Sequence, residues 1–229
     1  GTCPFTRGRE QSKIILLRTT TKRKKFEKVP NFLLENLAKM RGHVLIAGVD
    51  EAGRGPLAGP VVAGAVILPI EQIAFLSQSG LDDSKKLSSG KREQLFQLLL
   101  SCSVIGVGIA EVDEIDSVNI LQASFLAMER AVGALSPGPD YALVDGNKLP
   151  NLPCSGEYVV KGDCRSLSIA AASIIAKVRR DLIMRQLAEL YPGYGWERNA
   201  GYGTAEHKSA LERLGVTEHH RKSYAPINK

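Results

Sequence analysis

The chain has 229 residues, of which 44% are hydrophobic, and a formal net charge of +6. This length is enough for one sizeable hydrophobic core with a small appendage, and the positive charge favours a polyanionic partner. No run of about 18 apolar residues occurs, so we expect no membrane-spanning helix. The four scattered cysteines fit neither a zinc site nor a disulfide framework, which predicts reduced thiols and a cytoplasmic protein.

The N-terminal part of the chain is basic. Residues 21–25 form the run Thr-Lys-Arg-Lys-Lys, in a stretch with little hydrophobic periodicity. Such a run is typical of a solvated tail, and it can also attract phosphate groups without sequence preference, so both interpretations stay open. Residues 30–40 are predicted to form a short helix, whose inner face carries Leu33, Leu34 and Leu37.

From residue 43 onward the pattern alternates between strands and helices. Runs rich in Val, Ala and Ile predict strands at residues 43–50, 60–68, 104–111, 141–145 and 158–160. Apolar residues at helical spacing predict helices at residues 71–77, 88–101, 117–135, 162–190 and 204–214. Three strands followed by alternating helices and strands are typical of a mixed α/β sheet. We therefore expect a basic extension with a short helix at residues 1–40 and a single domain at residues 41–229.

A glycine-rich turn follows the first predicted strand. Residues 53–58 have the spacing Gly-x-Gly-x-x-Ala of a dinucleotide-binding turn. Such a turn must open a helix whose N-terminus meets a pyrophosphate, whereas residues 59–67 are typical of a strand. Asp50 and Glu51 also stand just before the glycines, where they would repel an anionic ligand. The sequence therefore does not predict a dinucleotide site.

Asp50 and Glu51 come at the end of an apolar strand. Buried carboxylates are costly unless they are paired or bind a metal. Adjacent strand residues point to opposite faces, so both can reach one site only where the strand ends. Gly53 and Gly55 provide that ending and leave the backbone bare for a sugar-phosphate chain, and Arg54 offers a guanidinium to a phosphate. A charged turn without function explains this segment equally well when it is considered alone.

Two further carboxylates follow predicted strands. Asp145 ends an apolar strand and precedes Gly146, at the kind of sheet edge where α/β proteins build their sites. Asp163 follows Gly162 in the same way. Each has an alternative explanation: Asp145 suits a turn, and Asp163 suits the N-cap of the long helix that follows. Three separate segments that each end in a carboxylate at a glycine turn favour one shared site.

Clustered carboxylates without a neighbouring His/Cys set are suited to hard divalent cations. Mg²⁺ and Mn²⁺ prefer oxygen ligands and keep several waters. Two such ions about 4 Å apart can hold both the attacking and the leaving oxygen of a phosphoryl displacement. A basic protein with this carboxylate set is therefore suited to cutting a phosphodiester.

The motifs resemble those of a known family. Residues 48–61 closely resemble the signature of type 2 ribonucleases H, and residues 83–88 are similar to that family's D-S-K-x-L-S segment. Further similarities lie at residues 143–146, 161–163, 169–181, 201–204 and 220–224, so the resemblance runs from about Leu45 to Pro226. The resemblance implies a ribonuclease-H-like fold, which is a mixed five-stranded sheet with flanking helices, for the domain at residues 41–229.

The resemblance also assigns the metal ligands. It implies that Asp50, Glu51, Asp145 and Asp163 bind Mg²⁺ or Mn²⁺, with two ions in each active site. It identifies these same four carboxylates as the catalytic residues.

Contacts with the substrate are implied in the same way. The turn Gly53-Arg54-Gly55 would read the ribose 2′-hydroxyl, which distinguishes RNA from DNA. Tyr202 would stack on the sugar downstream of the cut, and Ser84 and Lys85 would contact backbone phosphate. The family's last motif usually has Phe where this chain has Tyr224, a change at an expected packing position.

The implied activity is endonucleolytic. A monomer would hydrolyse the RNA strand of RNA/DNA hybrids and incise duplex DNA at single ribonucleotides, leaving 3′-hydroxyl and 5′-phosphate ends. Two alternatives are another nuclease of the same fold, such as an integrase or junction resolvase, and a non-catalytic nucleic-acid-binding protein. A mere binder would gain nothing from four negative charges facing phosphates.

Several other polar and aromatic residues are open to two interpretations. Lys177, one turn past Ser173 on the long predicted helix, suits the site and a solvated surface equally well. His207, His219 and His220 lack further ligands at metal spacing, so we expect them at the surface or in caps. Three aromatic residues could stack on a base, but packing of the helix end is the expected role of Tyr191, Tyr194 and Trp196.

Overall fold

The five predicted strands form one mixed sheet, although the fifth spans Ser155–Val159 rather than residues 158–160. The computed structural model describes residue 1 and residues 29–227, so the basic run at residues 21–25 lies outside the described residues. The strand order is β3-β2-β1-β4-β5. The strands are β1 Ile46–Ala52, β2 Val61–Ile67, β3 Val104–Ala110, β4 Tyr141–Asp145 and β5 Ser155–Val159. The predicted fold class, a mixed five-stranded α/β sheet, is confirmed.

Strand direction determines where the carboxylates gather. β1, β2 and β3 pair antiparallel, whereas β4 lies parallel to both β1 and β5. The C-terminal ends of β1, β4 and β5 therefore meet at one edge of the sheet. Val49 lies beside Val144, and Asp145 lies beside Val159. The residues that follow these positions along each strand thus emerge together.

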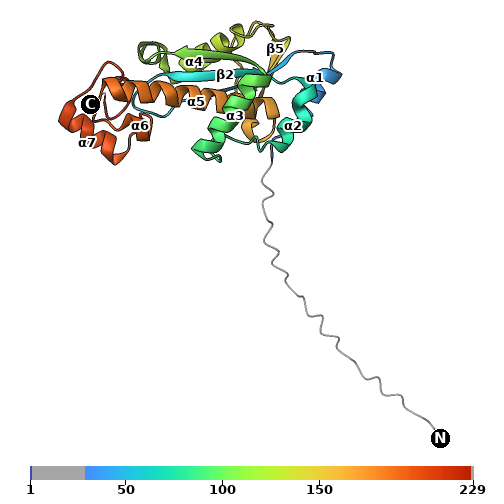
Figure 1. Ribbon diagram of the computed structural model, residues 1–229, viewed down its shortest axis with the longest axis horizontal. Coiled ribbons are helices and arrows are strands. Elements are labelled where there is room, and N and C mark those ends of the chain that lie inside the picture. The colour runs from blue at the N-terminus through green and yellow to red at the C-terminus, as the bar shows by residue number, and fades with distance from the viewer. Residues whose placement is uncertain (2–28, 228–229) are drawn as a thin grey trace.

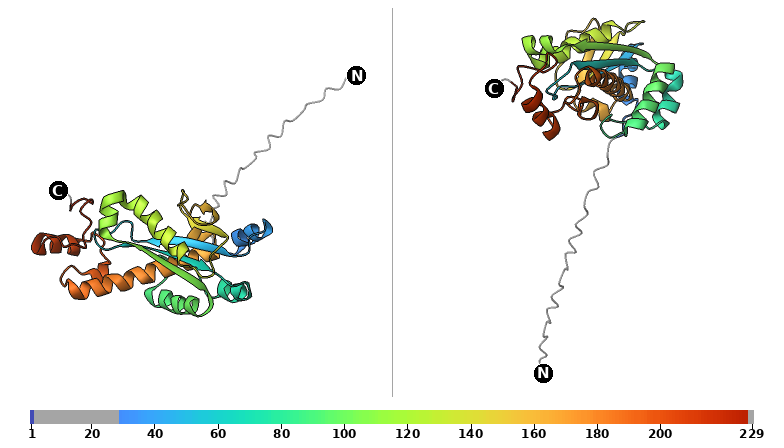
Figure 2. Two further views of the ribbon diagram at one scale, coloured as in Figure 1. Left: turned by 90° about the horizontal axis from the view of Figure 1, so that it is seen from above. Right: turned by 60° about the vertical axis from the view of Figure 1, so that its left-hand side comes forward.

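Helices cover both faces of the sheet (Figures 1 and 2). The view from above in Figure 2 shows α4 on one face and α3 and α5 on the other. The helices are α1 Leu33–Met40, α2 Ile73–Gln78, α3 Ser89–Cys102, α4 Val112–Gly133, α5 Leu167–Leu190, α6 Trp196–Asn199 and α7 Ala205–Leu214, with short 3₁₀ turns at Ile70–Gln72 (η1) and Gly162–Cys164 (η2).

Alternate residues of the strands pack into the two hydrophobic cores that lie on opposite faces of the sheet. Val49 and Ala65 pack with Ile115 of α4, whereas Val66 packs with Leu99 of α3 and Ile174 of α5. This alternation follows from the two-residue period of a strand, and it buries the sheet on both faces.

The helix α5 lies unusually close to the sheet. A Cβ on Gly48 of β1 would come within 2.1 Å of the Ser168 carbonyl carbon, and one on Gly64 of β2 within 2.6 Å of the Ala172 oxygen. Only glycine fits beneath the helix backbone at these two positions. The predicted small-residue packing of residues 170–172 is confirmed, because all three alanines are fully buried.

The helix α1 faces the core with a different side from the predicted one. Leu33 and Leu37, expected on the inner face, are 59% and 39% exposed, whereas Glu35 and Ala38 are fully buried. The Glu35 carboxylate accepts hydrogen bonds from the Ser166 hydroxyl at 2.6 Å and from the Ser168 amide at 2.9 Å. These bonds at the start of α5, together with the packing of Ala38 in the core, set the orientation of α1. The division of the chain after residue 40 stays a prediction.

Two helix starts were predicted at the wrong residues. Helix α4 begins at Val112 rather than at 117, and the Glu114 carboxylate accepts the Glu111 amide at 2.9 Å in its first turn. The interior of α4 is broken at Asn119, where φ is +70°.

The long helix α5 begins at Leu167 rather than at residue 162. The Ser166 hydroxyl caps it by accepting the Ile169 amide at 3.1 Å. Asp163 is therefore not the cap of this helix, and it lies in the 3₁₀ turn before it.

The C-terminal segment packs as a satellite core against the end of α5. Tyr194 and Trp196 are buried there, as the packing interpretation predicted, and Thr204 caps α7 as expected. The placement of the histidines was wrong for two of the three, because His207 and His220 are fully buried. Within the described part of the chain, no helix has the length and apolarity needed to cross a membrane.

Candidate active site

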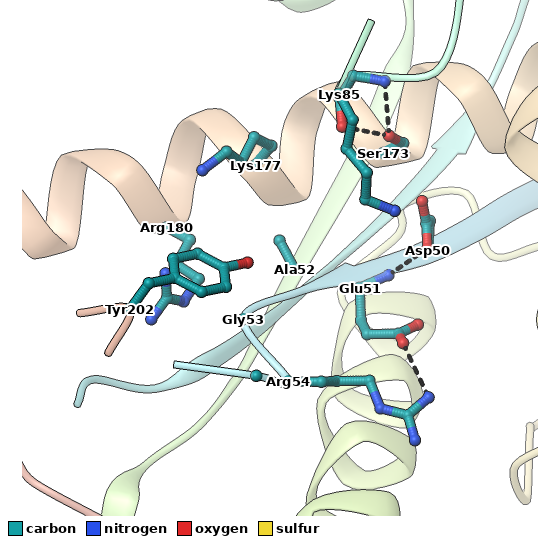
Figure 3. A pocket seen from close by; sticks show the side chains of 12 residues that line it. Asp50, Glu51, Ala52, Gly53, Arg54, Lys85, Ser173, Lys177, Arg180 and Tyr202 are labelled. Atoms are coloured by element: carbon teal, nitrogen blue, oxygen red, sulfur yellow. Dashed lines mark hydrogen bonds and ion pairs between the residues drawn. The ribbon is translucent and has the colours of Figure 1, made fainter. Parts of the chain in front are cut away.

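The first two carboxylates of the predicted quartet lie in one pocket with the glycine turn (Figure 3). Asp50 and Glu51 emerge from β1 just before its last residue, Ala52. Figure 3 shows Glu51 turned toward Arg54, Asp50 near the end of the Lys85 side chain, and the Tyr202 ring on the other side of the pocket. The residues that line the pocket are Asp50, Glu51, Ala52, Gly53, Arg54, Gly55, Ser84, Lys85, Ser173, Lys177, Arg180 and Tyr202.

The other two carboxylates lie next to this pocket at the same sheet edge. Asp145 ends β4, and Asp163 lies in the turn after β5. Neither lines the pocket itself. Their negative charges nevertheless raise the pKa of Asp50, so both lie within electrostatic reach of Asp50.

Burial and repulsion by neighbouring charges raise the pKa values of Asp50, Glu51 and Asp145. Burial raises the pKa of Asp50 well above its usual range, and the charges of Glu51 and Asp145 raise it further. Burial also raises the pKa of Glu51, although the guanidinium of Arg54 partly offsets that effect. The pKa of Asp145 is raised by burial as well. A cation that neutralised these charges would therefore stabilise the folded protein.

Local hydrogen bonds direct the individual carboxylates. An oxygen of Asp50 accepts the Glu51 amide at 2.7 Å, and one of Asp145 accepts the Gly162 amide at 2.6 Å. Glu51 is turned toward Arg54, whose Nη1 lies 3.4 Å from its Oε1. These contacts leave other carboxylate oxygens available, because each carboxylate has two oxygens and about four acceptor sites.

The tightest set of possible metal donors is a different one. Among the described residues, the donor atoms of Asp83, Asp163 and Cys164 lie within 4.8 Å of one another. No three members of the predicted quartet come that close together. The quartet still offers only carboxylate oxygens, the donor type that suits Mg²⁺ and Mn²⁺.

The glycine turn is fastened from beneath by a buried arginine. Gly53 has φ +102°, a conformation that favours glycine. Arg180 of α5 lies under it and donates from Nε to the Pro60 oxygen at 2.9 Å and from Nη2 to the Ala58 oxygen at 3.1 Å. Burial lowers the pKa of Arg180 to about 10, so the guanidinium remains charged at neutral pH.

Lys85 faces the carboxylates. Its burial lowers its pKa, but the negative charges of Asp83, Asp50 and Asp163 outweigh that effect, so its pKa is raised. The neighbouring Ser84 is almost fully buried, and its hydroxyl accepts from the Ser173 hydroxyl at 2.7 Å. The pocket therefore includes both residues expected to contact phosphate, but the Ser84 hydroxyl is already engaged with α5.

The long helix contributes two residues that the sequence did not assign to the site, Ser173 and Arg180, and one whose role it left open, Lys177. Ser173, Lys177 and Arg180 lie one turn apart along α5, and each lines the pocket. Of the two interpretations of Lys177, the pocket position is the observed one, and its ammonium pairs with Asp181 at 2.7 Å. The buried stripe Ala172, Ala176, Arg180 and Met184 repeats every four residues, and this spacing could have placed Arg180 inside.

Tyr202 lies across the pocket from the carboxylates. Its side chain is 45% exposed, so it is not part of the core. The buried His207 contacts its carbonyl oxygen through Nδ1 at 3.0 Å, and the His207 Nε2 accepts the Trp196 indole N–H at 3.0 Å. Burial lowers the pKa of His220, the second member of the histidine pair, to about 4. Burial lowers the pKa of His207 as well, so both histidines are structural groups, and His207 holds the Tyr202 backbone while His220 contacts His207 at 3.1 Å.

Sequence comparisons agree on one family. The family model for ribonuclease HII matches residues 47–227. Ribonuclease HII of Ruegeria pomeroyi is 56% identical over 201 residues, which cover 87% of this chain and 84% of that protein. Ribonuclease HII of Rhodospirillum rubrum is 60% identical over 186 residues, covering 80% of this chain and 85% of that protein.

Solved structures have the same fold. Ribonuclease H2 from Pyrococcus horikoshii matches with a TM-score of 0.68 and 27% identity, covering 81% of this chain and 96% of its own. The PCNA:RNase HII complex from Archaeoglobus fulgidus gives a TM-score of 0.65 and 25% identity, covering 79% and 95%. Bst-RNase HIII in complex with Mn²⁺ gives a TM-score of 0.67 at 19% identity, covering 81% and 68%, and bears on the fold alone.

Proposed function

Since the chain belongs to the ribonuclease HII family and is therefore a ribonuclease H endonuclease, we propose that it hydrolyses the RNA strand of RNA/DNA hybrids and also incises duplex DNA at single ribonucleotides. The products would carry 3′-hydroxyl and 5′-phosphate ends. The observation that supports this proposal is the pocket in which a bare glycine turn faces carboxylates and an exposed tyrosine.

The carboxylates Asp50, Glu51, Asp145 and Asp163 are the proposed ligands of divalent cations. They fit such ions, because the donors are all carboxylate oxygens and three of the four have pKa values raised by burial. A pair of Mg²⁺ or Mn²⁺ ions would supply the charge that activates a water and stabilises the leaving oxygen. A bound cation would take the place of the protons that the raised pKa values favour on Asp50, Glu51 and Asp145.

The turn at residues 53–55 is the proposed reader of the ribose. Neither glycine has a Cβ, so the backbone can approach a 2′-hydroxyl closely. A site built to bind a hydroxyl strongly rejects a substrate without one, because its own polar groups are then left unpaired. One ribose occupies this turn, which is why a lone ribonucleotide suffices.

Other side chains of the pocket position the substrate. Tyr202 would stack on the sugar downstream of the cut, since its ring is exposed and faces the pocket. Lys85 and Ser84 would contact backbone phosphate, with Lys85 also balancing the carboxylate charge. Lys177 and Arg54 supply further positive charge at the same pocket.

A gel assay on three duplexes tests the proposal. The substrates are a DNA duplex with one ribonucleotide, an RNA/DNA hybrid and an all-DNA duplex, each with Mg²⁺ and with a chelator. We expect cuts in the first two with Mg²⁺ only, on the 5′ side of the lone ribonucleotide. A need for several consecutive ribonucleotides would contradict the role of the turn, and a 2′,3′-cyclic phosphate product would contradict attack by water. Cleavage of the all-DNA duplex would favour a resolvase-like activity.

A further inference from the structure

The carbonyl groups of the glycine turn point away from the pocket, toward the C-terminal segment. Arg221 donates from Nη2 to the Gly53 oxygen at 2.5 Å and from Nη1 to the Arg54 oxygen at 2.9 Å. The Tyr224 hydroxyl donates to the same Arg54 oxygen at 2.8 Å. Two carbonyls of the turn are therefore fixed by residues about 170 positions later in the chain.

Fixing these carbonyls also fixes two amides. A trans peptide unit is planar, and its N–H points opposite to its C=O. The Gly53 carbonyl shares its peptide unit with the Arg54 amide, and the Arg54 carbonyl shares its unit with the Gly55 amide. Within the described residues, neither amide donates to a protein acceptor, and both residues line the pocket.

The fastening segment is itself well anchored. The Asp116 carboxylate of α4 accepts the Lys222 amide at 2.8 Å and the Ser223 amide at 3.0 Å, directly between the two fastening residues. Arg221 is fully buried and donates to backbone carbonyls and to the Tyr224 oxygen, and its guanidinium lies 5.2 Å from the centre of the Tyr224 ring. Residues 221–224 can therefore hold the backbone of the turn in a fixed position.

We propose that the Tyr224 hydroxyl, together with Arg221, is a positioning and specificity-determining group that aims the Arg54 and Gly55 amides at the ribose 2′-hydroxyl. This inference rests on the proposed function of the turn. Tyr224 touches the turn and not the substrate, so it sets how well a ribose is distinguished from a deoxyribose. It has no role in the chemical step.

Removing only the hydroxyl tests the proposal. Tyr224→Phe keeps the ring on Arg221, deletes one of the two hydrogen bonds to the Arg54 oxygen and removes the Tyr224 oxygen, which accepts a long hydrogen bond from Arg221 Nη1 at 3.4 Å. The measurement is the ratio of dissociation constants for an all-DNA duplex and for the same duplex with one ribonucleotide, by fluorescence anisotropy at low salt with a chelator. The wild-type protein is expected to prefer the ribonucleotide duplex, and Tyr224→Phe is expected to lower that preference roughly two- to ten-fold, the equivalent of one net hydrogen bond.

Tyr194→Phe is the matched control. Its hydroxyl donates to the Gly215 oxygen at 2.9 Å, a bond of the same kind that lies outside the pocket. It should leave the preference unchanged, and both variants should bind the all-DNA duplex as the wild type does, because that binding depends on phosphate contacts.

The possible outcomes separate the two proposals. A wild-type preference that survives in Tyr224→Phe would overturn this inference alone, as would an equal loss of affinity for both duplexes, which indicates a merely structural role. A wild-type protein with no preference for the ribonucleotide would overturn the proposed reading by the turn, and this inference with it.

Discussion

Gly55 differs from Gly53, the other glycine of the turn, because the fold leaves room for a side chain at position 55. A Cβ built on Gly55 would meet only the Tyr202 ring carbon Cε1 at 3.7 Å, an ordinary contact, and its φ is not in the left-handed range. The fold therefore has no need of a glycine at this position. If the missing Cβ serves any purpose, it serves a molecule that enters the pocket.

We predict that Gly55→Ala folds like the wild type and loses activity. The free energy of unfolding should stay within about 1 kcal/mol of the wild-type value, with a gain possible because alanine restricts the unfolded chain. The added methyl group would separate a ribose from the turn and leave a polar group without its hydrogen bond, which costs about 1–3 kcal/mol. That cost corresponds to a loss of roughly five- to 150-fold in kcat/KM on a duplex with one ribonucleotide.

Gly53→Ala, in contrast, should lower the free energy of unfolding. Its φ of +102° strains an alanine, and its Cβ would lie 2.1 Å from the Arg180 Nε and 2.8 Å from the Pro60 oxygen. Strain of about 1–3 kcal/mol adds to overpacking of about 1–3 kcal/mol, so a loss of roughly 2–6 kcal/mol in stability is expected. Gly133→Ala on α4 is the control for the substitution itself, since nothing lies within 4 Å of its Cβ.

Two measurements on the three variants distinguish a glycine that the fold requires from one that the substrate requires. Urea unfolding gives the stabilities, and initial rates on the one-ribonucleotide duplex give kcat/KM. Normal turnover by Gly55→Ala would refute the idea that a ribose approaches the turn closely. A stability loss in Gly55→Ala as large as that in Gly53→Ala would refute the steric reasoning.

Three further predictions concern the carboxylates and the tyrosine. Asp145→Asn should nearly abolish cleavage while melting temperature and hybrid binding stay close to wild type, and near-normal turnover with Mg²⁺ would contradict the assignment. Tyr202→Ala should strongly lower activity at unchanged stability, since the ring is 45% exposed, and a lower melting temperature with normal activity per folded molecule would instead indicate a packing role. Burial and the charges of Glu51 and Asp145 raise the native pKa of Asp50, so the contribution of Asp50 to the stability of the metal-free protein should be fully present below the unfolded value of about 3.9 and be lost as pH rises through the raised value. Asp50→Asn should remove this loss and also reduce the stabilisation by added Mg²⁺. Identical pH profiles of urea unfolding for Asp50→Asn and the wild type would count against the raised pKa.

Local pattern was enough to predict the sheet and the position of its carboxylates. The apolar runs before Asp50 and Asp145 are read directly as strands, and the glycines after them mark where each strand ends. The parallel pairing of β1, β4 and β5 then places these ends at one edge, as a mixed α/β sheet requires. Their assignment as metal ligands remains a proposal, because the donor geometry follows from side-chain rotamers that no sequence pattern specifies.

The groups that fasten the turn could not be predicted, because their partners are far away in the chain. Arg221 reaches back 168 positions to Gly53, and Arg180 reaches back 120 to Pro60. The burial of Glu35 likewise depends on Ser166, 131 positions later, which is why the predicted inner face of α1 was wrong. A hydrogen bond between distant residues leaves no periodic trace in either segment.

The two buried arginines also explain how this pocket can hold opposite charges. A buried guanidinium is usually paired with a carboxylate, because an unpaired charge is costly to bury. Arg180 and Arg221 donate almost entirely to neutral backbone carbonyls instead. Among the described residues, no carboxylate forms an ion pair with either guanidinium, whereas the charges of Asp50 in the pocket and Asp145 beside it repel each other. Divalent cations would neutralise the carboxylates, and the phosphates of a nucleic acid would balance the positive charge of the arginines. Each ligand would therefore stabilise a charge that the protein alone leaves uncompensated.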